Sequence, residues 1–342
     1  MIDTPTQIRK GEELPLQALQ QYFTTQQLPT IINILQYPSG YSNLTYCIQT
    51  EEGDMVLRRA PFGASAQGGH NMEREFRLSE AIAQHYAKIP RPIHMCRDTN
   101  IIGSPFYLMQ KMEGIIIRKD NASFDASFYK KLSYHTAEEL AHIHNLPNIV
   151  LPDLGRPDGY VHRQITGWIA RHEQAQTTEI SGMKEINEWL VRNMPLEQGN
   201  AIIHNDYKYD NIILSSTDHS IVGILDWEMT TRGCPLMDLG ASLGYWLESE
   251  DTPELRALPF CPTHLPGNLS RLEFIDTYAQ IRGISIPKPS FYLVYGVWRL
   301  IIILEQIYKR YVIGHTKDPR FQALGQSFPL LIAHAMKLKR EP

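Results

Sequence analysis

The octet HNDYKYDN, residues 204–211, places a histidine, two aspartates, a lysine and two asparagines side by side. The apolar stretch AII precedes it and the apolar stretch IIL follows it, which predicts a buried strand on either side. Polar groups are costly to bury unless they are paired. The octet therefore indicates either a solvated turn or a functional site held between buried strands.

The strand predicted after the octet, SIVGILD at residues 220–226, ends at Asp226. We expect hairpin pairing to bring Asp206, Asn211 and Asp226 to one edge, where their oxygens form a set suited to Mg²⁺. The spacing H-x-D-x-x-x-x-N, which the catalytic loop of phosphoryl-transfer enzymes uses, is matched by His204, Asp206 and Asn211. The pattern therefore favours a phosphoryl-transfer site over a polar turn.

Phosphoryl transfer needs such a set of oxygen ligands because the protein contributes positioning and charge neutralisation to this reaction rather than covalent chemistry. One carboxylate must orient and deprotonate an acceptor hydroxyl, while other oxygens hold the metal against the phosphates. Lys208, two residues after Asp206, is placed to meet the transferring phosphate as a point charge.

Composition limits the classes of protein to consider. The chain has 342 residues, 43% hydrophobic and 20% charged, which suits a globular protein of two domains. A net charge of -4 gives no basic footprint for nucleic acid, and four cysteines without a CxxC pair predict reduced thiols. The N-terminus lacks an apolar signal core, and the apolar stretch 291–304 is too short to span a bilayer. We expect a cytoplasmic protein without nucleic-acid or membrane partners, of undetermined oligomeric state.

The order of predicted elements indicates an α+β fold. Strands are predicted at 30–37, 45–50, 55–60, 93–96 and 105–112, and a helix at 71–88. Helical patterns follow at 123–146, 159–177, 183–194, 235–249, 270–282, 288–312 and 319–338, with one short β patch around the octet. We therefore expect an N-terminal lobe, 1–112, of five strands and one helix. A mostly helical lobe, 113–342, is expected to carry the catalytic and metal-binding loops.

Several motifs carry a family resemblance. They are SGYSNLTY, VLRR, MEREF, FYLMQKMEG, HNDYKYDN and LDWEMTTRGCPLMDLG. In these motifs the chain resembles the aminoglycoside phosphotransferase family, the small-molecule branch of the protein-kinase-like fold, from about Thr30 to Arg310. The stretches GRPDGYVHRQITGWIARHE and EINEWLVRNMP are most similar to one subgroup, the kinase-like domain associated with acyl-CoA dehydrogenases.

The resemblance implies a two-lobe kinase-like fold that binds ATP and Mg²⁺, with ATP held near residues 110–114. It implies that Asp206 is the catalytic base, that Asn211 and Asp226 bind the metal, and that Lys208 contacts phosphate.

The same resemblance assigns nucleotide-binding roles in the first lobe. The turn over the phosphates would be lined by Ser42, Asn43 and Thr45. Backbone groups of Gln110 and Met112 would hydrogen-bond adenine, and Glu75 would pair with the cation of the third strand.

The chain departs from the kinase pattern in the third strand, where Arg58 and Arg59 stand in place of a lysine. Strand alternation should turn only one of them inward, and Arg58, which shares a face with Val56, is the favoured candidate. An arginine can bridge phosphate oxygens and a glutamate through its planar fork. The phosphate loop has Gly40 as its single glycine, and Glu228 replaces the glycine of DFG; it would either assist the metal or hydrogen-bond the loop.

Other signals concern the support of the site. The stretch GASLG, residues 240–244, matches the nucleophile elbow of hydrolases, but its context predicts a helix with small residues for close packing. Asp238 is expected to anchor the catalytic loop through buried hydrogen bonds, and His204 to shape the loop. Arg299, alone in an apolar helix, must have a partner and is either a paired core charge or a ligand for an anionic substrate.

The expected function is transfer of the γ-phosphate of Mg-ATP to a hydroxyl of a small molecule. Subgroup resemblance points to a hydroxyacyl-CoA or hydroxy acid as the acceptor. An aminoglycoside kinase and a catalytically silent nucleotide-binding module are the alternatives, and an esterase would require Ser242 to be exposed at a sharp turn.

Overall fold

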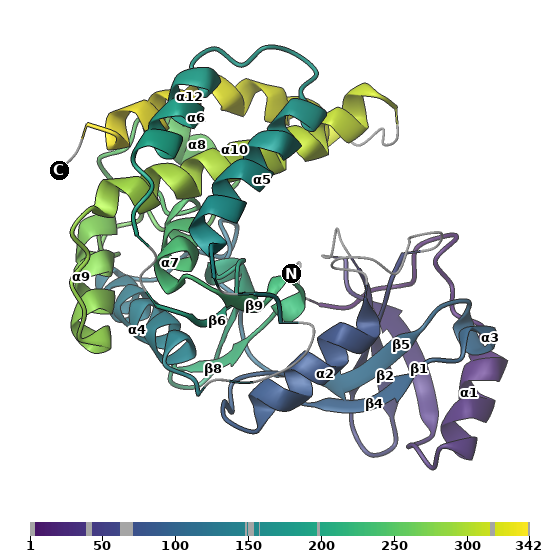
Figure 1. The fold of residues 1–342 in the computed structure, drawn as a ribbon. Helices are drawn as coiled ribbons and strands as arrows, with labels where there is room; N and C mark the ends of the chain where they lie inside the picture. The colour runs from purple at the N-terminus through teal and green to yellow at the C-terminus, as the bar shows by residue number, and fades with distance from the viewer. Residues whose placement is uncertain are drawn as a thin grey trace. The chain divides into compact units, whose positions relative to one another are not determined.

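The computed structural model describes residues 4–38, 43–61, 71–147, 149, 154–156, 158–196, 199–314 and 319–340. The chain divides into two compact units. The first unit is Met1–Ile116 with Ile212–Met229, and the second is Ile117–Asn211 with Thr230–Pro342. The predicted α+β class is confirmed, because the first unit is built on a sheet and the second is mostly helical (Figure 1). The segment Ile212–Met229 groups with the first unit, whereas the sequence prediction assigned it to the helical lobe.

The first unit contains an antiparallel sheet in the order β1-β2-β3-β5-β4. Its strands are β1 (Ile31–Gln36), β2 (Leu44–Thr50), β3 (Met55–Arg59), β4 (Pro92–Cys96) and β5 (Phe106–Gln110), all of which were predicted. The predicted helix is α2 (Met72–Ala83), and Asn71 caps it by accepting a hydrogen bond from the Arg74 N–H.

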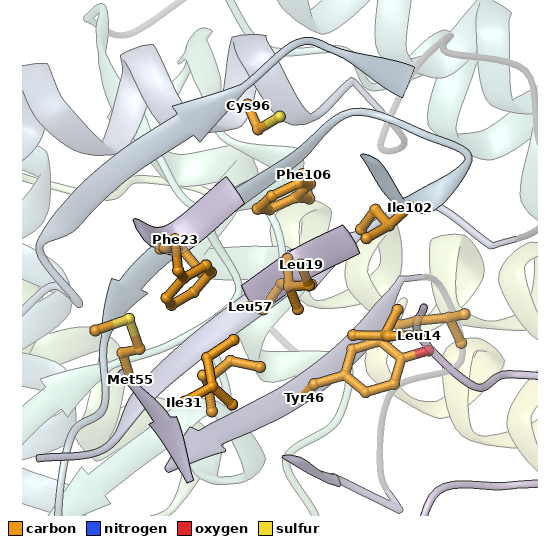
Figure 2. Close-up of a cluster of buried hydrophobic side chains, with 13 residues drawn as sticks. Leu14, Leu19, Phe23, Ile31, Tyr46, Met55, Leu57, Cys96, Ile102 and Phe106 are labelled. Atoms are coloured by element: carbon orange, nitrogen blue, oxygen red, sulfur yellow. The ribbon is translucent and has the colours of Figure 1, made fainter. Parts of the chain in front are cut away.

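Two further helices, α1 (Leu16–Thr25) and α3 (Thr99–Ile102), make the prediction of a single helix in this region wrong. The apolar side of α1 places Leu19 and Phe23 in a cluster with Leu57 and Phe106 of the sheet (Figure 2). Tyr107 points to the opposite face, where its hydroxyl donates to Glu75 of α2. Helices therefore cover both faces of the sheet.

The β structure around the octet forms two separate ladders rather than the single patch that was predicted. In the first unit β7 (Ile212–Leu214) pairs with β8 (Ile221–Ile224), and in the second β6 (Ala201–Ile203) pairs with β9 (Thr231–Gly233). The strand β9 was not predicted, because three residues with one glycine give too short a pattern.

Apart from one short helix at Pro253–Ala257, which was not predicted, the helices of the second unit follow the predicted order. They are α4 (Ala126–His144), α5 (Tyr160–Ala175), α6 (Met183–Arg192), α7 (Pro235–Leu243), α8 (Pro253–Ala257), α9 (Arg271–Arg282), α10 (Pro289–Val312), α11 (Pro319–Ala323) and α12 (Ser327–Leu338). The predicted helix at 319–338 is divided by a 3₁₀ turn, Leu324–Gln326, and α7 ends earlier than predicted.

The long apolar helix α10 packs against α5, α7 and α12 (Figure 1). Within the described residues it is the one helix whose length and hydropathy could cross a membrane, and 78% of its apolar window is buried inside the protein. At its crossing with α7, Gly296 contacts the backbone of Gly240 and Gly244 so closely that a Cβ at Gly296 would overlap the Gly240 carbonyl. The small residues of GASLG therefore serve helix packing, as predicted.

Candidate active site

The octet forms a loop of the second unit that Asp238 of α7 anchors from a fully buried position. Asp238 Oδ2 accepts the His204 N–H at 2.7 Å, and Oδ1 accepts the Asn205 N–H at 2.7 Å. Burial alone would raise the pKa of Asp238, but His144, 3.0 Å away, and the backbone N–H groups outweigh burial and lower it below its ordinary value. The predicted anchoring role is confirmed.

Further side chains of the octet are also hydrogen-bonded. His204 is fully buried, and its Nδ1 accepts the Asp206 N–H at 3.2 Å, so the predicted loop-shaping role is confirmed. The Tyr207 hydroxyl donates to the Thr136 carbonyl at 2.9 Å. The octet is therefore a fixed loop and not a solvated turn.

This fixed loop presents one carboxylate, Asp206, between two partners from the same octet. Lys208 Nζ lies 2.7 and 2.8 Å from the two Asp206 oxygens, and Asn211 Nδ2 donates to Asp206 Oδ2 at 3.0 Å. Burial lowers the pKa of Lys208, but Asp206 outweighs burial, and the net shift is upward. Lys208 therefore stays charged, and its Nζ also lies 4.6 Å from the ring centre of Tyr245.

Asn211 has a side-chain oxygen that is available to bind a magnesium ion. Its Nδ2 is used by Asp206, and within the described residues its Oδ1 accepts no hydrogen bond. The next residue along the chain, Ile212, pairs with Ile224, two residues before Asp226. Amide and carboxylate oxygens suit Mg²⁺, which needs few protein ligands when it binds phosphates. The described residues hold no cluster of three or more His, Cys, Asp or Glu side chains with metal-binding geometry.

A second group of charges, the Arg58 cluster, lies in the first unit and consists of Arg58, Glu75, Asp226 and Glu228. Arg58 Nε is 3.1 Å from Glu75 Oε1, and Arg58 Nη2 is 2.9 Å from Asp226 Oδ1 and also pairs with Glu228. Burial lowers the pKa of Arg58, but Glu75 and Asp226 outweigh burial and raise it well above its ordinary value. The predicted pairing of Glu75 with the third-strand cation is confirmed.

The two arginines of β3 lie on opposite faces of the sheet. Arg59 is 1% exposed and donates to the Ile102 carbonyl at 2.7 Å, on the face that α1 covers. The expectation that only one arginine turns inward is wrong, because helices enclose both faces. Arg58 is nevertheless the one that meets Glu75, as the alternation of β3 favoured.

The remaining predicted nucleotide residues are placed as follows. Asn43 is buried and its Nδ2 donates to Glu228 Oε2 at 2.7 Å, and Thr45 stands opposite Arg58 in the β2–β3 register. The Gln110 N–H donates to the Arg91 carbonyl at 2.8 Å and is not available to adenine. Met112 packs against Gly223 of β8, and Ser42 lies outside the described residues. Their nucleotide-binding roles stay predictions.

Among the described residues, four residues other than glycine have a positive φ. One of them, Asn205, directly precedes Asp206, and another, Asp226, belongs to the Arg58 cluster. Asn205 and Asp226 both have φ of +67°, which is uncommon for residues other than glycine. Such conformations cluster at functional sites, where the surrounding structure holds them in place. Neither conformation was predicted from the sequence, although asparagine and aspartate tolerate this region better than most residues.

A cavity of about 10 Å³ lies beside Lys208 and is lined by Ser242, Tyr245 and Trp246 among others. This volume admits about one water molecule. Ser242 lies inside α7, is 6% exposed, and within the described residues its hydroxyl has no hydrogen-bond partner. The nucleophile elbow that an esterase needs is absent at this serine, because Ser242 lies within a helix rather than at a strand-to-helix turn.

Comparison with known proteins identifies the family of the chain. Residues 33–258 match the model of the family described as "Phosphotransferase enzyme family". Acyl-CoA dehydrogenase family member 11 of Gallus gallus is 32% identical over 85% of the chain, and family member 10 of Mus musculus is 31% identical over 93%. The chain spans only 38% and 30% of the length of these two relatives.

Solved structures show the same fold. A provisionally named aminoglycoside phosphotransferase of Ralstonia eutropha has a TM-score of 0.79 and 24% identity, covering 96% of this chain and 99% of that one. The GDP complex of aminoglycoside 2'-phosphotransferase-IIIa has a TM-score of 0.63 and 15% identity, covering 94% of this chain and 98% of that one. With its family model matched across most of its length, the chain belongs to the phosphotransferase enzyme family.

Proposed function

We propose that the protein transfers the γ-phosphate of Mg-ATP to a hydroxyl group of a small molecule. The observation that carries the proposal is the Asp206 carboxylate, which an anchored loop holds between Lys208 and Asn211. The family supports phosphotransferase chemistry, and the GDP bound to a structural relative supports the use of a nucleotide.

In the proposed reaction Asp206 accepts the proton of the acceptor hydroxyl as that oxygen forms a bond to the γ-phosphorus. The bond between the γ-phosphorus and the bridging oxygen breaks, and ADP leaves with the electron pair. Lys208 offers its positive charge to the phosphoryl group in transfer. Bound Mg²⁺ would supply charge neutralisation at the phosphates, with Asn211 Oδ1 and the Asp226 carboxylate as its protein ligands.

The proposal assigns contacts with the nucleotide to the first unit. Asn43, Thr45 and Arg58 would meet the phosphates, and the backbone near Met112 would meet adenine. Arg58 suits this role because its planar fork can hold Glu75 with one edge and a phosphate oxygen with another.

The acceptor is proposed to be a hydroxyacyl-CoA or a hydroxy acid. Support comes from the relatives named as acyl-CoA dehydrogenase family members, which contain a region similar to almost the whole of this chain. The names of the structural relatives favour an aminoglycoside instead, and this is the alternative acceptor.

The test is product analysis by phosphorus NMR and mass spectrometry with Mg-ATP or Mg-GTP and a panel of hydroxy acids, hydroxyacyl-CoAs and aminoglycosides. We expect a phosphate ester from one class, and loss of roughly 100- to 10,000-fold in turnover for Asp206→Asn. The matched control is Asp210→Asn, since Asp210 lies in the same loop but pairs with Arg118 at 3.0 Å. Near-wild-type turnover in Asp206→Asn would show that this carboxylate is not the base.

A catalytically silent nucleotide-binding module is the second candidate, favoured by one observation. In the Arg58 cluster a guanidinium already pairs with Glu228 and with Asp226, the carboxylate proposed as a metal ligand. Stabilisation by Mg-ATP in a thermal-shift assay, with no product from any class of acceptor, would favour this candidate over the kinase.

A further inference from the structure

Arg299 is an unusual residue of the core of the second unit. It lies in the apolar helix α10 and is 5% exposed, and within the described residues no carboxylate forms an ion pair with it. Its Nη2 donates to the Asn205 carbonyl at 2.8 Å, and its Cζ lies 5.3 Å from the ring centre of Trp168. A buried charge with so few partners is costly, so its presence calls for an explanation.

The carbonyl that Arg299 binds belongs to the peptide joining Asn205 to Asp206. Asn205 has the left-handed φ of +67°, its N–H donates to Asp238 at 2.7 Å, and its Oδ1 accepts from the Tyr160 hydroxyl at 3.3 Å. Asp238 on α7 and Arg299 on α10 therefore hold opposite ends of one strained residue. The direction in which the next side chain, Asp206, leaves the loop depends on both.

We propose that Arg299 is a positioning residue, which fixes the Asn205–Asp206 peptide and thereby aims the Asp206 carboxylate. This inference rests on the proposed function, in which Asp206 is the catalytic base. Direct binding of an anionic substrate, the other role considered for Arg299, fits the structure less well. Its guanidinium is enclosed by the Trp168 ring and the loop carbonyl, and only 5% of the residue is exposed.

The chain offers a matched control for this proposal. Arg171 also lies over the Trp168 ring, with its Cζ 4.6 Å from the ring centre, but it is exposed and makes no hydrogen bond to the loop. Arg171→Met removes a cation from Trp168 and leaves the Asn205 carbonyl satisfied. Arg299→Met removes both contacts, and Arg299→Lys keeps the charge while it loses the planar fork.

The experiment measures release of inorganic phosphate from Mg-ATP, with water as the acceptor, for the intact chain and the three variants. A lost hydrogen bond from a charged group corresponds to roughly 10- to 100-fold in rate. We expect Arg299→Met to lose this much in kcat with KM for Mg-ATP within about twofold, Arg299→Lys to recover part of it, and Arg171→Met to match the wild type. Unchanged kcat in both Arg299 variants, or an equal loss in Arg171→Met, overturns the proposal.

Hydrogen exchange of the amides in residues 204–207 gives a second readout that does not need turnover. We expect faster exchange of these amides in Arg299→Met and, to a smaller extent, in Arg299→Lys, with α5 and α10 as protected as in the wild type. Unchanged exchange in the loop overturns the positioning role. If the wild type releases no phosphate while the exchange difference is present, the proposed function fails and the structural role of Arg299 stands.

Discussion

The Asp206 group of the second unit, which consists of Asp206, Lys208 and Asn211, and the Arg58 cluster of the first unit both pair one cation with acidic groups, but they are built differently. Asp206, Lys208 and Asn211 come from one octet, and Asp238 fixes the start of that octet through the His204 and Asn205 N–H groups. The Arg58 cluster joins residues up to 170 positions apart in the sequence.

The two groups also differ in charge balance. The loop pairs one cation with one carboxylate, whereas Arg58 faces Glu75, Asp226 and Glu228. The side chains of Arg58 and Glu75 are 12% and 5% exposed, against 18% and 22% for Lys208 and Asp206. Asp226 is more open, with 32% of its side chain exposed. Because three carboxylates share one buried cation, loss of Arg58 should affect stability more than changes in the loop.

The largest effect on stability is expected for Arg58→Met. Removal of the guanidinium leaves three carboxylates without their shared cation, and breaking a buried ion pair costs about 3–5 kcal/mol. Urea denaturation would measure the loss. Arg97→Met is the control, because Arg97 pairs with Glu73 on the surface of the same unit and should leave the midpoint unchanged. An equal midpoint for Arg58→Met and the wild type would contradict the contrast drawn between the two groups.

A loss of about 2–3 kcal/mol is expected for Asp238→Asn, because a neutral amide cannot accept from both backbone N–H groups and still meet His144. The pKa of Asp238 is lowered in the folded protein. The stabilisation that the ionised carboxylate gives to the folded protein is therefore present above the unfolded pKa of about 3.9, and it is lost as the pH falls through the folded pKa. The stability gap between variant and wild type should therefore narrow in acid. A gap that widens below about pH 4 would argue against the anchoring role.

The next-largest loss of stability is expected at the crossing of α7 and α10, the two helices that hold the loop. Gly296→Ala introduces a methyl group against the Gly240 backbone, and overpacking of this kind costs about 1–3 kcal/mol. Gly167→Ala in α5 is the control, since a Cβ there meets only Arg171 at 3.5 Å, and the change should be neutral or stabilising. Equal stabilities of the two variants would show that the α7–α10 crossing can shift without cost.

The smallest effect is expected for Glu75→Gln, below about 1 kcal/mol at neutral pH. Burial and the neighbouring Asp226 raise the pKa of Glu75 despite Arg58. A raised folded pKa contributes stability below the unfolded value of about 4.3, and this contribution is lost as the pH rises. The stability of Glu75→Gln relative to the wild type should therefore increase from acid to neutral pH. For Asp238→Asn the relative stability should decrease over the same range. Paired denaturation curves at pH 4 and pH 7 measure both trends.

The difference between the two groups also explains what could be predicted from the sequence. The loop residues share one short spacing, so His204, Asp206 and Asn211 could be found from local pattern. The strands and most helices could be predicted for the same reason, because a local pattern encodes each of them. The three partners of Arg58 and the hydrogen bonds of Arg299 depend on tertiary packing, which no local period encodes. The helices α1, α3 and α8 were missed because they lie outside the motifs, and the strand β9 was missed because it has only three residues.

The glycine contact between α7 and α10 has a consequence for how this protein can vary. Asp238 and Arg299 sit on the two helices whose main chains touch at Gly240 and Gly296. Because no side chain separates the two main chains at this crossing, the spacing of the helices cannot adjust. The separation of the two residues that hold the loop, Asp238 and Arg299, is therefore fixed. Substitutions that change activity should therefore accumulate among the residues around the loop, whereas the glycines of the helix crossing tolerate almost no increase in side-chain size.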